Sequence, residues 1–172
     1  LTKAGSGTLT LSGNNTFTGD MTINAGIVKL TGALSASTDL IIDNDATLDL
    51  QVSQIFASLD LDGTITRTAG ASALTVSGLS NLDGSVTTTG TQTYTGAITL
   101  AADTTLTSTG AAITASAIDG GYDLTIVSGA AQSLTNAIGS STPLTSINVS
   151  TTSGNLTLAN NITVTGTGTD AM

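Results

Sequence analysis

Six aspartates lie within 24 consecutive residues that end at Asp62, and they form the densest group of ionisable side chains in the sequence. Carboxylate oxygens are ligands that Ca²⁺ prefers. If Asp43 and Asp45 lie on one coil of the chain and Asp60 and Asp62 on the next, four carboxylates and the amide of Asn44 could converge on one Ca²⁺ ion. The spacing of an EF-hand is absent, and the alternative interpretation is that these aspartates close turns.

The same aspartate pairs could supply the two carboxyl groups of a glycoside hydrolase, because residues i and i+2 of a strand point the same way. Other catalytic groups are scarce. The sequence has no His, Cys or Glu, so its many Ser and Thr hydroxyls lack a His that could act as a general base. A polysaccharide lyase needs a basic residue, and only Lys3, Lys29 and Arg67 are basic. We therefore expect no catalytic residue and no enzymatic activity, with Ca²⁺ as the one candidate cofactor.

Threonines separated by one residue recur along the chain, and they raise a third possibility, a surface that orders water into ice. Outward Thr pairs would form such a surface only if they stack in register on successive coils. Their irregular spacing argues against this, and the alternative is that exposed strand positions simply favour Thr. The runs are Thr8/Thr10, Thr64/Thr66/Thr68, Thr91/Thr93/Thr95, Thr105/Thr107 and Thr163/Thr165/Thr167/Thr169.

Short β-strands must position these groups. Apolar residues separated by one mostly polar residue mark the strands, and Asn, Asp and Gly between them mark turns. Thr is abundant, Pro143 is the only proline, and no stretch has the apolar spacing of a helix, so we expect an all-β fold. The apolar pairs are Leu9/Leu11, Val28/Leu30, Leu40/Ile42, Leu48/Leu50, Leu59/Leu61, Leu74/Val76, Ile98/Leu100, Leu124/Ile126, Ile147/Val149, Leu156/Leu158 and Ile162/Val164.

The sequence also repeats itself. The segment Asn15–Ile23 recurs as Gln92–Leu100, with Thr, Gly, an aromatic residue and aliphatic residues at the same places. Apolar pairs that begin at positions 9, 28, 48, 74, 98, 124 and 147 step by 19 to 26 residues, which is the length of one β-helix coil. Repetition of this kind is typical of a solenoid, in which each unit packs on its neighbours.

We therefore predict one domain, residues 1–172, that folds as a parallel β-helix of about seven coils. An antiparallel sandwich of short strands is the alternative. The residues expected to point inward, stacked on successive coils, are Leu9, Leu11, Leu48, Leu50, Leu74, Val76, Ile98, Leu100, Leu124 and Ile126.

The formal net charge of −9 disfavours nucleic acids and anionic membrane surfaces as partners. No apolar run approaches the ~20 residues that are needed to span a bilayer. Both ends of the sequence consist of repeat-like segments without a polar cap. We therefore expect a segment of a longer rod, or a subunit that stacks end to end with other copies.

The N-terminal sequence from Leu1 to Gly19, continuing through Thr22 to Gly26, resembles the passenger-associated repeat of bacterial autotransporters. The stretch from Thr91 to Gly129 is similar to repeats of filamentous-haemagglutinin-type exoproteins. The resemblance implies a right-handed parallel β-helix that is exported and displayed at or beyond an outer membrane. It also implies adhesion, aggregation or a stalk-like role rather than one conserved activity.

The residues and the resemblance together predict a non-enzymatic, structural or adhesive β-solenoid at the bacterial cell surface or outside the cell. Its expected partners are further copies of itself, the surface of a host or neighbouring cell, or a polysaccharide. Binding of ice or of a polysaccharide, and less so cleavage of a polysaccharide, is the alternative function.

Overall fold

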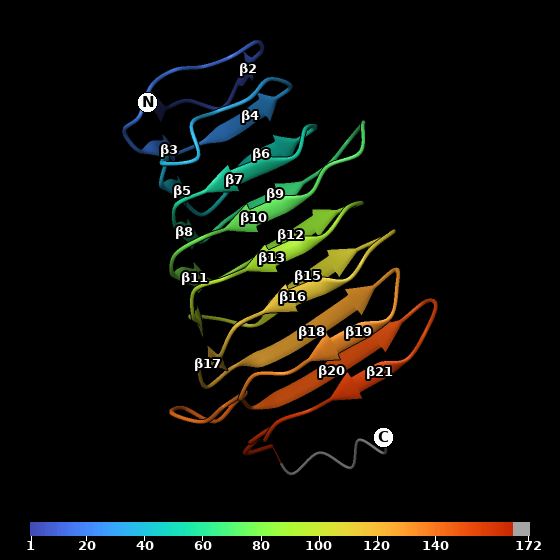
Figure 1. Ribbon diagram of the computed structural model, residues 1–172. Helices are drawn as coiled ribbons and strands as arrows, with labels where there is room; N and C mark the ends of the chain where they lie inside the picture. The colour runs from blue at the N-terminus through green and yellow to red at the C-terminus, as the bar shows by residue number, and fades with distance from the viewer. Residues whose placement is uncertain (167–172) are drawn as a thin grey trace.

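The computed structural model describes residues 1–166 and is a right-handed parallel β-solenoid (Figure 1). Each coil of the chain contributes strands to long sheets that run the length of the rod, which we name A, B and C. The strand pairs within all of these sheets are parallel. Within residues 1–166, no helix is long and apolar enough to cross a bilayer.

In the complete coils the chain passes first through sheet A, then through sheet B and then through sheet C; the first two coils have no strand in sheet C, and the last coil has none in sheet A. Sheet A contains β1 (Thr2–Lys3), β3 (Met21–Ile23), β5 (Leu40–Ile42), β8 (Leu59–Leu61), β11 (Ser80–Leu82), β14 (Ile98–Leu100) and β17 (Ile118–Asp119). Sheet B contains β2 (Thr8–Leu11), β4 (Gly26–Leu30), β6 (Ala46–Leu50), β9 (Thr64–Thr66), β12 (Ser85–Thr88), β15 (Thr104–Ser108), β18 (Asp123–Ser128) and β20 (Ser146–Thr151). Sheet C contains β7 (Gln54–Phe56), β10 (Leu74–Val76), β13 (Gln92–Tyr94) and β16 (Ile113–Ala115). Next to β16, the pair β19 (Gln132–Leu134) and β21 (Leu156–Leu158) forms a separate two-stranded sheet that continues this side of the rod.

The rod has eight coils, one for each strand of sheet B. Partner residues on neighbouring strands of sheet A are 18 to 21 positions apart, as the pairs Asn81–Thr99 and Asp60–Asn81 show. The predicted right-handed parallel β-helix is therefore confirmed, with eight coils where the sequence indicated about seven.

The difference in the number of coils arises because the apolar pairs used to count them lie in different sheets. The pairs that begin at Leu9, Val28 and Leu48 stack in sheet B, whereas Leu74 is in sheet C and Ile98 is in sheet A. The prediction that these pairs stack on one another was therefore wrong for Leu74 and Ile98. A pair of apolar residues marks a strand in any of the three sheets, so it cannot by itself identify the sheet.

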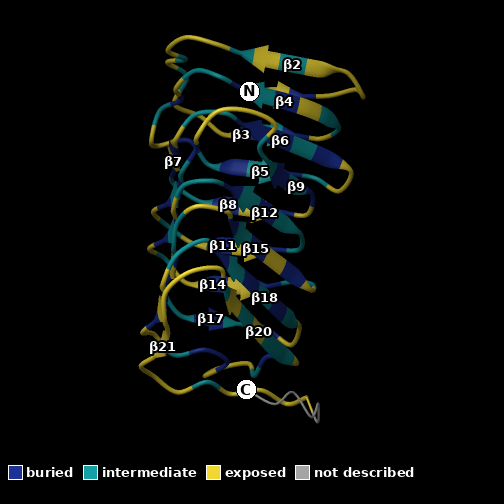
Figure 2. Ribbon diagram, turned by 90° about the vertical axis from the view of Figure 1, so that its right-hand side faces the viewer, coloured by how far each residue is buried: buried dark blue, intermediate teal, exposed yellow. Residues whose placement is uncertain are grey.

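The interior is filled by ladders of aliphatic side chains that continue from coil to coil. One ladder of sheet B runs through all eight strands and consists of Leu9, Val28, Leu48, Ile65, Val86, Leu106, Ile126 and Val149. Its six inner members are fully buried, while Leu9 and Val149 in the end coils are partly buried. Figure 2 shows the same gradient, with more exposed residues in β2 and β21 than in the strands between them. A fully buried aliphatic side chain contributes about 1.5–3 kcal/mol, so such ladders stabilise a rod that has few aromatic residues.

The ten residues predicted to point inward do so. Eight of them are buried, and Leu9 and Leu11 in the first coil are partly buried against the core.

The two copies of the internal repeat occupy corresponding places in the rod, because both lead from the sheet C side into sheet A. The later copy contains β13 and β14 and the earlier copy contains β3, four strands away from β14 in sheet A.

Buried glutamines interrupt the aliphatic ladder of sheet C, and this was not foreseen. The side chain of Gln54 pairs with the backbone of Leu34: its Oε1 accepts from the Leu34 amide at 3.0 Å, and its Nε2 donates to the Leu34 carbonyl at 3.1 Å. Gln132 forms the same two-bonded pair with the backbone of Ile113. These amide side chains therefore satisfy backbone groups that would otherwise lack a partner inside the rod.

A third buried glutamine, Gln92, connects two coils and the corner of sheet B. Its Nε2 donates to the carbonyls of Thr107 at 2.7 Å and Val86 at 3.3 Å, and also to the Thr88 hydroxyl at 3.3 Å. Its Oε1 accepts from the hydroxyl of Tyr94 at 3.1 Å. Burial raises the pKa of this tyrosine, so the hydroxyl stays protonated and donates.

Candidate functional site

The four aspartates predicted as Ca²⁺ ligands lie near the corner at which sheet A leads into sheet B. Asp43 and Asp62 directly follow β5 and β8, Asp60 is the middle residue of β8, and Asp45 lies in the turn before β6. Because β5 and β8 are neighbours in sheet A, Asp43 and Asp62 lie on adjacent coils, which is the condition that the predicted Ca²⁺ site requires.

Negative charges gather around Asp62. Desolvation raises the pKa of its carboxyl group, and the charges of Asp60, Asp83 and Asp43 raise it further. Like charges favour the neutral form of a carboxyl group, and they also attract cations. Asp83 follows β11 on the next coil, so the acidic group extends beyond the predicted set.

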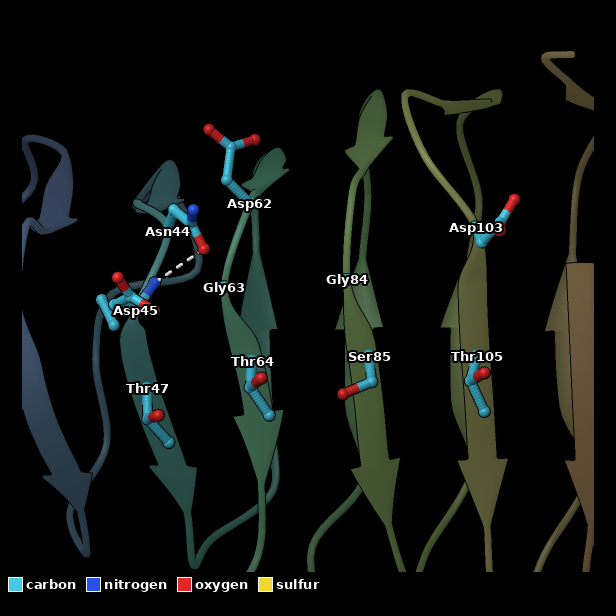
Figure 3. A pocket seen from close by; sticks show the side chains of 11 residues that line it. Asn44, Asp45, Thr47, Asp62, Gly63, Thr64, Gly84, Ser85, Asp103 and Thr105 are labelled. Atoms are coloured by element: carbon cyan, nitrogen blue, oxygen red, sulfur yellow. Dashed lines mark hydrogen bonds between the residues drawn. The ribbon is translucent and has the colours of Figure 1, made fainter. Parts of the chain in front are cut away.

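The geometry of this corner does not form a coordination shell for a metal ion. Among residues 1–166, no three His, Cys, Asp or Glu side chains are arranged to hold one. Figure 3 shows the carboxyl groups of Asp45, Asp62 and Asp103 on separate coils, without a common point toward which they turn. Binding of Ca²⁺ at Asp43, Asp45, Asp60 and Asp62 stays a prediction.

Two of the predicted ligands have structural roles. Asp45 has a φ of 65°, a left-handed conformation that Asp tolerates better than most residues do. The Ala46 amide donates to the Asp43 carbonyl at 3.0 Å, which closes the turn before β6, and the Asp45 amide donates to the Oδ1 atom of Asn44 at 3.0 Å within it. Asp60 accepts a hydrogen bond of 2.9 Å from Asn81 on the next coil. These contacts match the alternative interpretation, in which the aspartates organise turns and neighbouring coils.

The structure reveals a regular pattern at this corner that the sequence analysis missed. On five successive coils an aspartate lies two residues before an outward hydroxyl residue, and the hydroxyl residues stack in register in sheet B. The pairs are Asp45/Thr47, Asp62/Thr64, Asp83/Ser85, Asp103/Thr105 and Asp123/Thr125. The signal that could have revealed them is the recurrence of Asp-x-Thr/Ser every 17 to 21 residues.

Part of this pattern lines a shallow, open groove on the outside of the rod (Figure 3). Its walls carry carboxylates, an amide and hydroxyls from the corner and from the first outward position of sheet B. The polar residues that line it are Asn44, Asp45, Thr47, Asp62, Thr64, Ser85, Asp103 and Thr105. These groups can accept and donate hydrogen bonds to a polar ligand or to water.

The basic residues of the described chain have other partners. The Nζ of Lys3 is partly buried and donates to the carbonyls of Ala4 at 3.1 Å and Ala25 at 3.0 Å, which fastens the first coil to the second. Arg67 donates to the carbonyl of Gly70 within its own turn. Lys29 lies directly beside Asp49 on the neighbouring strand of sheet B. None of these three residues lines the groove at the corner.

Asp49 is a buried aspartate on the outer side of sheet B, and its contacts are structural. Its Oδ1 accepts from the Thr68 amide at 2.8 Å, and its Oδ2 accepts from the Thr68 hydroxyl at 2.6 Å and from the Gln51 side chain at 2.8 Å. Burial by itself would raise the pKa of Asp49, but the hydrogen bonds from Thr68 and Gln51 and the charge of Lys29 lower it. The ionised carboxylate thereby fixes the turn that follows β9.

The predicted Thr-x-Thr runs divide between different parts of the rod. Thr8/Thr10, Thr64/Thr66 and Thr105/Thr107 are all in sheet B, and Ser85 and Thr87 of β12 continue the last two runs in register. The run Thr91/Thr93/Thr95 centres on β13 in sheet C, and Thr163 and Thr165 follow β21. Thr167 and Thr169 lie outside the described residues.

Comparison with known proteins gives one match. Residues 1–30 match the family model described as passenger-associated-transport-repeat. No curated protein and no solved structure matches the chain. The similarity of Thr91–Gly129 to filamentous-haemagglutinin-type repeats is not confirmed. The matched segment contains β1, β2, β3 and β4, so the resemblance to the passenger-associated repeat is confirmed for the first coil and for the sheet A and sheet B strands of the second.

Proposed function

We propose that this chain is a non-enzymatic structural segment of an exported bacterial passenger, and that it forms part of an adhesive rod at the cell surface or outside the cell. The match of residues 1–30 to the passenger repeat supports export and display. The solenoid supports a stalk role, because each coil packs on its neighbours and lengthens the rod by about 4.8 Å.

The observation that carries this proposal is the exposure of core positions at the last coil. Leu156 and Leu158 continue the inward positions of sheet C, yet they are 41% and 43% exposed, whereas Leu134, which pairs with Leu158, is 3% exposed. Val164, bridged to the buried Leu144, is 43% exposed. Within residues 1–166 no segment covers these side chains, so a further coil would bury them.

Further coils can come from the same polypeptide or from a second copy. Strand edges with unpaired backbone groups readily pair with another strand. When the last coil of one copy contacts the first coil of the next, such head-to-tail contacts produce filaments unless they close into a ring. The proposal therefore includes end-to-end stacking as the form of self-association. A receptor on a host or neighbouring cell, or a polysaccharide, is the proposed target of the assembled rod.

Sedimentation velocity and electron microscopy over a range of concentrations test the proposal. We expect concentration-dependent, end-to-end association of the chain, which the Leu156→Lys/Leu158→Lys variant weakens strongly. Ile55→Lys is the matched control, because Ile55 is also in sheet C and is 44% exposed but belongs to an inner coil. A stable monomer at high concentration, together with mass spectrometry identifying Leu1 and Met172 as the mature termini, would contradict both routes to a longer rod.

A further inference from the structure

The outer side of sheet B carries a regular array of hydroxyl groups. We define the hydroxyl array as the seven outward hydroxyl residues of β9, β12, β15 and β18, which form two files along the rod. The first file is Thr64, Ser85, Thr105 and Thr125, and the second is Thr66, Thr87 and Thr107; on β18 the next position of the second file is Val127, which has no hydroxyl. The residues between the files, Ile65, Val86, Leu106 and Ile126, are fully or almost fully buried, so the strands hold the array on a rigid core.

The strand register fixes the spacing of the hydroxyl array in two directions. Neighbouring strands lie about 4.7–4.9 Å apart, and residues i and i+2 of one strand lie about 6.4–6.8 Å apart. Figure 1 shows β9, β12, β15 and β18 running parallel, one below the next. The array is therefore a two-dimensional lattice rather than a single row of threonines.

The hydroxyl groups of the array are available to a ligand. In the part of the chain that the structure describes, none of the seven hydroxyls has a hydrogen-bond partner in the protein; Thr105 is exposed and the other six residues are partly exposed. The inward hydroxyls at the end of the same strands differ, because Thr88, Ser108 and Ser128 each donate to a backbone carbonyl. The fold thus satisfies the inner row of hydroxyls and leaves the outer lattice to the solvent.

The composition of the array distinguishes between kinds of occupant. It contains no charged and no aromatic residue, and the carboxylates of Asp62, Asp83, Asp103 and Asp123 lie at its edge, two residues before the first file. A sugar chain is usually held by an aromatic ring, and an oppositely charged partner needs charges within the contact surface. A second copy of the same uncharged face would offer few apolar side chains to bury.

We propose that the hydroxyl array binds ice. The water oxygen atoms at a surface of ice repeat in a regular two-dimensional lattice, and the array offers hydroxyl groups at regular intervals in two directions. The hydroxyls can hydrogen-bond to water in that lattice, while the Thr methyl groups between them order the remaining waters. Because the lattice is preformed on a rigid sheet, little conformational entropy is lost on binding. This proposal is independent of end-to-end stacking, since it concerns the side of the rod.

Partition into slowly growing ice and inhibition of ice recrystallisation test the proposal on the purified chain. The test variant is Thr87→Tyr/Thr107→Tyr, which places two bulky rings in adjacent strands of the array. The matched control is Thr75→Tyr/Thr93→Tyr, because these residues are also outward, partly exposed and paired on adjacent strands, but in sheet C. Far-ultraviolet circular dichroism and thermal unfolding verify that both variants fold, since Tyr suits exposed strand positions.

We expect the unchanged chain and the sheet C variant to enter the ice and to slow recrystallisation, and the array variant to lose both effects. Exclusion of the unchanged chain from ice, at the level of an inert acidic protein, would overturn the proposal. So would equal behaviour of the two folded variants. A dimer that only the array variant abolishes, without any effect of the chain on ice, would assign the face to self-association instead.

Discussion

Replacement of Gln92 by Leu tests whether the buried amides of sheet C are needed for stability. A leucine fits the shape of the position, because the residues that pair with Gln92 on the neighbouring strands are Leu74 and Ile113. The change therefore removes hydrogen bonds with little change in packing. Its main consequence falls on Tyr94, whose buried hydroxyl would lose its acceptor.

The expected cost follows from the groups that lose a partner. An unsatisfied buried hydroxyl costs about 1–3 kcal/mol, and the carbonyl of Thr107 and the hydroxyl of Thr88 lose a donor as well. We expect Gln92→Leu to lower the free energy of unfolding by about 2–4 kcal/mol. Adding Tyr94→Phe removes the orphaned hydroxyl, so the double variant should recover about 1–3 kcal/mol of that loss.

Urea unfolding followed by far-ultraviolet circular dichroism measures the four corners of this double-mutant cycle. The coupling energy between the two residues should lie in the range of about 0.5–3 kcal/mol that contacting groups show. Tyr122→Phe is the control, because Tyr122 is 41% exposed and its hydroxyl can bond to water. A Gln92→Leu variant as stable as the unchanged chain, or no recovery by Tyr94→Phe, would refute the reasoning.

Three further predictions use the same fold. Leu100→Asp should lower the free energy of unfolding by several kcal/mol, because Leu100 is 2% exposed and the new charge would be unpaired; unfolding at an unchanged urea concentration would contradict this. Asp49→Asn should cost about 1.5–3 kcal/mol at neutral pH. Folding lowers the pKa of Asp49, so the carboxylate stabilises the folded chain above the unfolded pKa of 3.8, and this stabilisation is lost as the pH falls through the folded pKa. The free energies of unfolding of the two proteins should therefore become equal in acid. A difference in the free energy of unfolding that does not depend on pH would count against a role of the ionised carboxylate. Calorimetry with Ca²⁺ tests the predicted ligands: binding that disappears in Asp43→Asn/Asp45→Asn would support a metal site, and identical titrations of both proteins would reject it.

The all-β solenoid could be predicted from the sequence because its core residues alternate with outward residues, and this alternation is visible in short segments. Alternating apolar residues such as Leu74 and Val76 identify a strand and its inward face without knowledge of the neighbours. The sheet to which a strand belongs depends instead on the lengths of all preceding turns, and this is why Leu74 was placed beside residues that it does not contact. A polar residue at an inward position gives no such signal: Gln92 is buried only because backbone and side-chain groups of other coils surround its amide.

The acidic corner also could be predicted only in part from the sequence. Aspartates close together in sequence were expected to act together, and Asp43, Asp60 and Asp62 are indeed close enough to affect one pKa. The longer series of Asp-x-Thr/Ser pairs is distributed over about 80 residues, so only the register of sheet B brings its members side by side. Repeats whose period varies by a few residues are hard to recognise until the turns are known.

Each coil contacts only its immediate neighbours. The rod can therefore become longer or shorter by whole coils. Removing or duplicating a segment of about 20 residues would join two coils that present strands of the same sheets to each other, and it would shorten or lengthen the rod by about 4.8 Å. An insertion of one residue within a strand such as β15 would instead turn every following side chain of that strand to the other face. The length of the rod could therefore be adjusted by recombination between coils, without a new fold and without redesign of the ends.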